Sequence, residues 1–168
     1  MSMNDDRIIR FSGLKPGVYT YGFRLDDEFF AACENEEIRG GKVEFGVKME
    51  RMERMLLFTF SFSGELTTWC DRCLGDMTVG VTGEESLSVR FSDSETSTDE
   101  ETVILPESAT EIDLTPWMYE YVAVRMPLKH AHSEVDCDPA VTRYLVDEEQ
   151  KHDENYTDPR WDALKDLK

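Results

Sequence analysis

The residues best suited to chemistry are two cysteines, Cys70 and Cys73, in the run Trp69-Cys70-Asp71-Arg72-Cys73-Leu74. Two residues between thiols suit a shared metal ion, a redox disulfide, or a tight turn that contains cysteines without using them. The chain holds two more cysteines, Cys33 and Cys137, and three histidines. The sequence around the pair has to distinguish these three interpretations.

A redox role for the pair requires its first cysteine at the N-terminus of a helix, where the helix dipole lowers the thiol pKa. The ten residues 74–83 contain three glycines and several β-branched residues, which disfavour a helix there. The flanking segments are typical of antiparallel hairpins and not of a strand–helix–strand unit. A thiol–disulfide oxidoreductase that uses Cys70 and Cys73 is therefore kept as an alternative function.

A structural zinc site needs four ligands, and the pair supplies only two of them. The candidates for the other two are His130, His132 and Cys137, and there is no second Cys-x-x-Cys pair. We predict Cys70 and Cys73 as candidate metal ligands, with His132 and Cys137 as weaker candidates. A turn without metal stays open, so the expected cofactor is none, or zinc.

The elements that must position the pair are predicted strands. Apolar residues alternate with polar ones in 43–49 and 56–62, which favours an antiparallel sheet with one buried face. Strand-like residues return in 77–81 and 86–91, so the pair is predicted to connect two strands. Gly64 is expected to mark a bulge or bend. Closure of these long hairpins into a barrel is an option.

Helical signals are concentrated in the second half of the chain. Apolar residues at helical spacing predict one main helix over 113–126, packed against the sheet. Residues 139–146 and 158–168 predict short helices, the second with Asp158 as cap. We expect one α+β domain over 1–128 and an acidic region over 129–168 that docks on it. Trp161 is expected to pack on this domain or to bind a partner.

The charge of the chain restricts its partners. The 168 residues carry a net charge of −18, with 16 acids and 11 bases in residues 1–90 but 20 acids and 7 bases in 91–168. Such a balance disfavours bulk binding of nucleic acid and favours a basic partner. No apolar run approaches the ~20 residues of a membrane span, and the first residues lack a signal peptide. We therefore expect a cytoplasmic protein with reduced cysteines.

Several short motifs, in order, resemble a known family. The first ones are Gly13-Leu14-Lys15-Pro16-Gly17, Phe29-Phe30, Gly64 and Cys70-Asp71-Arg72-Cys73-Leu74. Ile112-Asp113-Leu114, Tyr119-Glu120, Met126-Pro127-Leu128 and Asp158-Pro159-Arg160-Trp161 follow. This order resembles the YceD family of large ribosomal RNA accumulation proteins, in the branch found in Bacteroides-like bacteria.

The resemblance implies a cytoplasmic bacterial factor in large-subunit biogenesis with no enzymatic activity and no small-molecule substrate. Many relatives carry a second cysteine cluster, where this chain offers only His130, His132 and Cys137. The implied partner is a basic ribosomal protein or a large-subunit precursor, with a zinc-stabilised interaction module as a further alternative.

The negative charge makes the basic ribosomal protein the preferred partner. Contact with RNA would need a local basic patch, for which Lys48, Arg51 and Arg54 together with Arg72 are the candidates. Candidate partner-binding residues are Arg72, Arg160 and Trp161.

Overall fold

The computed structural model describes residues 7–33, 35, 37–93, 102–133 and 136–149. Its strands are β1 (Ile8–Arg10), β2 (Gly17–Leu25), β3 (Gly40–Arg51), β4 (Met55–Trp69), β5 (Asp76–Phe91), β6 (Thr102–Leu105) and β7 (Glu111–Asp113). Its helices are α1 (Asp27–Ala32), α2 (Thr115–Val124) and α3 (Pro139–Glu149). The predicted α+β class is confirmed.

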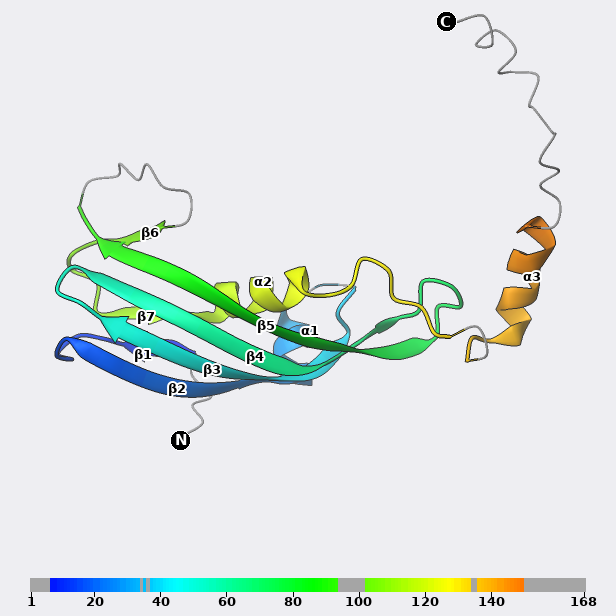
Figure 1. Ribbon diagram of the computed structural model, residues 1–168, viewed down its shortest axis with the longest axis horizontal. Coiled ribbons are helices and arrows are strands. Elements are labelled where there is room, and N and C mark those ends of the chain that lie inside the picture. Colours follow the sequence, from blue (N-terminus) through cyan, green and yellow to red (C-terminus); the bar gives the residue numbers. More distant parts are fainter. Residues whose placement is uncertain (1–6, 34, 36, 94–101, 134–135, 150–168) are drawn as a thin grey trace, which may run out of the picture.

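A long five-stranded sheet in the order β2-β3-β4-β5-β6 forms the body of the molecule (Figure 1). Strands β2 to β5 pair antiparallel, as the alternating sequence predicted, and β6 adds to β5 in parallel. β1 pairs with β7 instead of forming a hairpin with β2. Within the described residues the two edge strands, β2 and β6, do not pair with each other, so the optional barrel closure is not formed.

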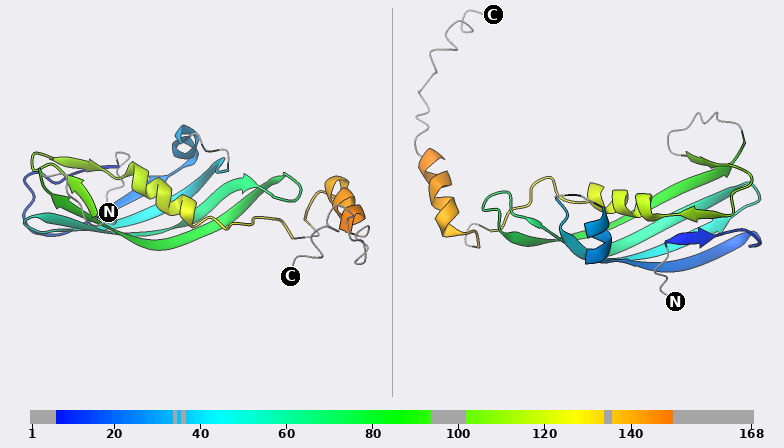
Figure 2. Two further views of the ribbon diagram at one scale, coloured as in Figure 1. Left: turned by 90° about the horizontal axis from the view of Figure 1, so that it is seen from above. Right: turned by 180° about the vertical axis from the view of Figure 1, so that it is seen from behind.

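One face of the sheet is covered and the other is open. Helices α1 and α2 and the β1–β7 pair all lie on the same face (Figure 2). Side chains at period two along β4, among them Leu56, Phe58 and Phe60, are fully buried beneath them. The buried stripe of α2, with Met118 and Val122, packs into the same core. Both residues belong to the apolar stripe that the sequence predicted for the main helix.

β4 and β5 form a hairpin much longer than an average strand pair. The two predicted strands in 77–91 are one continuous strand, β5, paired residue by residue with β4. The pairing is also regular at Gly64, which lies opposite Val43 and Val81, so the bulge expected there was wrong. Glycine is needed for a different reason: a Cβ at Gly64 would lie 2.1 Å from the Lys42 carbonyl oxygen. The neighbouring strand leaves no room for a side chain.

The C-terminal region leaves the sheet at one end. α2 is shorter than the predicted 113–126 because Asp113 belongs to β7, and the Asp113 carboxylate accepts from the Thr115 N–H at 2.9 Å. α3, which confirms the short helix predicted over 139–146, stands beyond the end of the sheet where β4 passes into β5 (Figures 1 and 2). The helix predicted over 158–168 lies outside the described residues, so docking of the region 129–168 stays a prediction.

No helix in the described part of the chain is long and apolar enough to cross a membrane.

Candidate metal centre at the hairpin tip

The alternation of β4 delivers Cys70 to the covered face of the sheet. Leu66, Thr68 and Cys70 follow one another at period two, and all three are fully buried. The chain then turns: the Leu74 N–H donates to the Cys70 carbonyl at 2.9 Å, and the Cys70 N–H donates to the Gly75 carbonyl at 2.8 Å. β5 begins at the next residue, Asp76. The Cys pair therefore connects two strands, as predicted, and we call residues 69–76 the hairpin tip.

The chain that follows α2 returns to this tip. Its described residues between α2 and α3, 125–133 and 136–138, form no helix or strand and pass the tip (Figures 1 and 2). Asp71 and His130 hold it there through reciprocal hydrogen bonds. The Asp71 N–H donates to the His130 carbonyl at 2.8 Å, and the His130 N–H donates to Asp71 Oδ2 at 2.8 Å. His130 Nε2 also lies 3.4 Å from Asp71 Oδ1.

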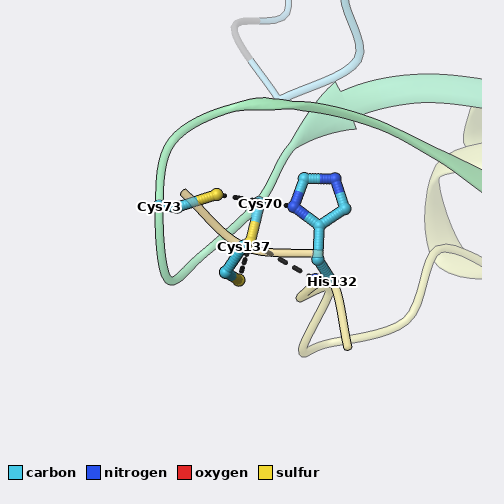
Figure 3. A group of neighbouring side chains, drawn as sticks. All are labelled: Cys70, Cys73, His132 and Cys137. Carbon is cyan, nitrogen blue, oxygen red and sulfur yellow. Dashed lines mark hydrogen bonds between the residues drawn. The ribbon is translucent and has the colours of Figure 1, made fainter. Parts of the chain in front are cut away.

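Four potential metal ligands meet where the two segments touch (Figure 3). They are Cys70, Cys73, His132 and Cys137, and their ligand atoms all lie within 4.8 Å of one another. Cys70 and Cys137 are buried, and Cys73 and His132 are half-buried. The four residues are therefore close enough to hold a metal ion.

Two of the distances between these atoms are close to those of tetrahedral zinc. Zn–S bonds of about 2.3 Å and Zn–N bonds of about 2.0–2.1 Å place tetrahedral ligands about 3.8 Å apart for two sulfurs and about 3.6 Å apart for sulfur and nitrogen. The Sγ atoms of Cys70 and Cys137 are 3.8 Å apart, and Cys73 Sγ lies 3.4 Å from His132 Nδ1. All four cysteines are free, since a disulfide needs an S–S distance of about 2.05 Å.

The ring of His132 is oriented as a ligand would be. Its Nε2 lies 3.1 Å from the Asp76 carbonyl oxygen, an acceptor that requires the proton on Nε2. Nδ1, which faces Cys73, then keeps its lone pair for a metal. An N–H to carbonyl bond of this kind fixes both the tautomer and the direction of a ligating imidazole.

Hydrogen bonds from the backbone favour thiolates in the cluster. Burial raises the pKa of Cys70, yet three backbone hydrogen bonds, the strongest from His132, together with one from the Cys73 side chain outweigh it and lower the pKa to about 6. The His132 N–H donates to Cys70 Sγ at 3.3 Å. A backbone hydrogen bond from Asp138, followed by Gly75 and the His132 side chain, lowers the pKa of Cys73.

The remaining thiol behaves differently. Burial, followed by hydrogen bonds to Cys70 and Cys73, raises the pKa of Cys137 to about 11. The hydrogen bond with Cys73 raises the pKa of His132. Three thiolates this close repel one another, so one thiol keeps its proton when no cation is near. A divalent cation among them would favour all three thiolates together.

The structure joins the predicted Cys pair to the two weaker candidates, His132 and Cys137, and leaves out His130, which is bound to Asp71 instead. A signal for this was present in the sequence. Period two along residues 56–70 puts Cys70 on the same face as the main helix, so the chain leaving that helix can reach it.

The predicted basic patch is not formed. Lys48, Arg51 and Arg54 lie at the β3–β4 turn, whereas Arg72 lies at the other end of the 15-residue strand β4, about 45 Å away. The Arg51 guanidinium is also engaged, because it donates to the Phe11 carbonyl. The Arg72 side chain makes no hydrogen bond or ion pair within the described part of the chain. Arg160 and Trp161 lie outside the described residues.

Comparison with models of protein families gives a match. Residues 58–168 match a family model described as "Large ribosomal RNA subunit accumulation protein YceD". The matched range contains all four residues of the candidate metal centre, and it begins after the motifs at 13–17 and 29–30. Searches of curated proteins and of solved structures find no match.

Proposed function

Since the chain belongs to the YceD family, whose name gives it a role in large ribosomal RNA accumulation, we propose that it is a non-catalytic assembly factor that binds a basic ribosomal protein. A cytoplasmic location is part of this proposal, because assembly of bacterial ribosomes takes place there. In this proposal the metal centre stabilises the fold, and the acidic C-terminal half attracts the basic partner.

The arrangement of the four ligands is the observation that carries the proposal. Two come from the hairpin tip and two from the chain that leads into α3. Three cysteines and one histidine satisfy all four positions of tetrahedral zinc, which is the composition of structural sites. Catalytic zinc keeps a position open for water or substrate. Zinc bound here would fasten the acidic C-terminal region to the sheet.

The charge supports a protein as the partner. A net charge of −18 repels RNA at long range, and 20 of the 36 acidic residues fall in 91–168. The same charge attracts a basic protein and speeds its association. Separation of Arg72 from the bases of the β3–β4 turn further weakens the case for an RNA-binding patch.

The proposal is tested with the full chain purified without chelator. Its zinc content is measured first, and the chain is then immobilised and exposed to total protein extracted from purified large ribosomal subunits. We expect about one zinc per chain and retention of one or a few basic proteins, released as salt rises from about 0.1 to 0.5 M. Large ribosomal RNA is offered separately. Retention of RNA alone, or of neither, contradicts the proposal.

A thiol–disulfide oxidoreductase is the second candidate, favoured by the lowered pKa of Cys70, about 6. Burial opposes it, because Cys70 is fully buried and such thiols need access to a substrate disulfide. The test is reduction of insulin disulfides by the chain after metal removal, with Cys70→Ser as the control. A rate equal to that of the control eliminates this candidate.

A further inference from the structure

Strand β5 has a long free edge. β4 pairs with its residues 76–90, whereas β6 covers only 88–91 on the other side. In the described part of the chain no strand pairs with 76–87 on that side, and Figure 1 shows β6 beside one end of β5 only. This stretch contains no proline, lysine or bulge, which are features that protect sheet edges from further pairing. It is therefore open to a further strand.

The direction of the backbone groups on this edge follows from the hairpin turn. The Cys70 N–H donates to the Gly75 carbonyl, so Gly75 faces the β4 side, and by strand alternation so do the odd-numbered residues of β5. The Tyr121 hydroxyl agrees with this alternation, because it donates to the outward carbonyl of Ser86 at 3.4 Å. The even-numbered residues in 78–84 therefore present N–H and C=O groups that no described strand uses.

Helix α2 packs against β5 beside this edge and makes it one wall of a groove. Where β6 begins there is a cavity of about 610 Å³, whose lining includes residues 85–88 of β5 and Trp117, Glu120 and Tyr121 of α2. The ion pair of Arg125 with Glu85 fastens α2 here. Burial, followed by Glu85 and Glu120, raises the pKa of Tyr121, which places both carboxylates near its hydroxyl. A strand added to the edge would lay alternate side chains along α2.

The unpaired charges beside the open part of this edge are negative. Arg125 pairs with Glu85, whereas the exposed side chains of Glu84 and Glu120 make no ion pair or hydrogen bond within the described residues. Arg90 also borders the cavity, but it lies in the stretch that β6 already covers. A basic segment therefore fits the groove better than an acidic one.

We propose that the free edge of β5 is the site at which a basic ribosomal protein adds an extended segment, bearing lysine or arginine, as a further strand of the sheet. This inference rests on the proposed function and adds to it the place and the form of the contact. A polypeptide repeats N–H and C=O groups at the spacing of the ladder, so the edge selects protein over RNA. A second copy of this chain fits less well, because β5 paired with itself would bring its acidic residues together.

The test uses the full chain and a peptide of about eight alternating lysine and valine residues. A control peptide with proline in place of each valine keeps the charge but cannot form the ladder. The variant Glu84→Lys with Glu120→Lys reverses both unpaired carboxylates of the groove. Its matched control, Glu28→Lys with Glu37→Lys, makes the same change of charge at exposed positions that do not line the cavity. Zinc content and thermal unfolding show whether each variant is folded.

We expect the alternating peptide to bind and to slow amide hydrogen exchange at the even-numbered residues in 78–84. Binding should be about tenfold or more weaker for the proline peptide, which loses the ladder, and for the Glu84→Lys, Glu120→Lys protein, which loses the attraction. The Glu28→Lys, Glu37→Lys protein should bind like the original chain. Equal affinity for the two peptides, or no slowing of exchange in β5, overturns strand addition.

Binding of basic proteins extracted from large ribosomal subunits is measured in parallel. If they bind the original chain and the Glu84→Lys, Glu120→Lys protein equally, the edge is not their contact and the proposed function stands without it. If the original chain binds none of them, the proposed function itself fails, even where the peptide binds β5. Light scattering gives the mass in solution. A stable dimer whose β5 amides are protected without peptide overturns the choice of occupant.

Discussion

The Nδ1 atom of His132 lies 3.4 Å from the Sγ atom of Cys73, a residue 59 positions earlier, while its Nε2 faces the carbonyl of Asp76. This contact joins the turn of the β4–β5 hairpin to the chain beyond α2, two segments that lie far apart in the sequence. The turn of the β4–β5 hairpin provides Cys73 and Asp76, and the chain beyond α2 provides the imidazole. Several of the following predictions depend on that junction.

Loss of a ligand should empty the metal centre. In Cys137→Ser, we expect zinc to fall from about one per chain to well below half, measured by elemental analysis of protein purified without chelator. A metal at a thousand times its Kd stabilises the native state by about 4 kcal/mol, so the midpoint of thermal unfolding should fall as well.

Cys33→Ser is the matched control for that variant. Cys33 is half-buried beside α1 and its thiol donates to the Phe29 carbonyl, far from the cluster in sequence and outside it in the structure. It should keep the full zinc content. Equal zinc in the Cys137→Ser and Cys33→Ser proteins would show that the cluster does not bind the metal.

Asp71 should support the centre without being a ligand. In Asp71→Ala the carboxylate that receives the His130 N–H at 2.8 Å is lost, so the returning segment is less well held. Loss of a residue that orients ligands typically costs 10–100-fold in metal affinity, and we expect a decrease of about that size in competition with a chromophoric chelator. Glu65→Gln, on the open face of the sheet, is the control and should bind zinc as before. An unchanged affinity in Asp71→Ala would remove this supporting role.

Two glycines of the central hairpin should respond in opposite ways to alanine. At Gly64 a Cβ would lie 2.1 Å from the Lys42 carbonyl oxygen, so Gly64→Ala should destabilise by about 3 kcal/mol through backbone displacement. At Gly80, opposite Glu65, a Cβ meets nothing within 4 Å. Gly80→Ala should be neutral or stabilise by about 0.5 kcal/mol, because alanine loses less backbone freedom on folding. Denaturant unfolding measures the free energy of unfolding of both variants. Similar losses of stability in the two would contradict the close contact at Gly64 and the open space at Gly80.

Tyr121 should make stability depend on pH in the alkaline range. Burial, followed by Glu85 and Glu120, raises the pKa of Tyr121 to about 12 from an ordinary 10.0. The folded state therefore holds this proton more tightly than the unfolded chain. Its contribution is complete below pH 10 and is lost as the pH rises through 10 to 12. Tyr121→Phe should flatten the fall in unfolding free energy over that window, and an unchanged slope would contradict this assignment.

Much of the fold could be predicted from local pattern. Alternation over 43–49 and 56–62 predicted the paired strands β3 and β4, and the helical stripe after Asp113 predicted α2. Such patterns are legible because side-chain direction follows the local backbone period, which is 2.0 in strands and 3.6 in helices. Pairing of β1 with β7, about a hundred residues apart, leaves no local period in the sequence and could not be predicted in this way.

The sequence by itself determined the thiol pair in a strand connection, the acidic balance, and the motifs that resemble the YceD family. It did not decide whether Cys70 and Cys73 had further ligands, because His132 lies 59 positions after Cys73 in the chain. Only the tertiary structure decided this. β4 carries Cys70 to the covered face, and α2 packs on that face, so the chain beyond it brings His132 and Cys137 within 4.8 Å of the pair. Ligand sets of this kind depend on packing between distant segments, whereas local sequence fixes only the neighbours of each residue.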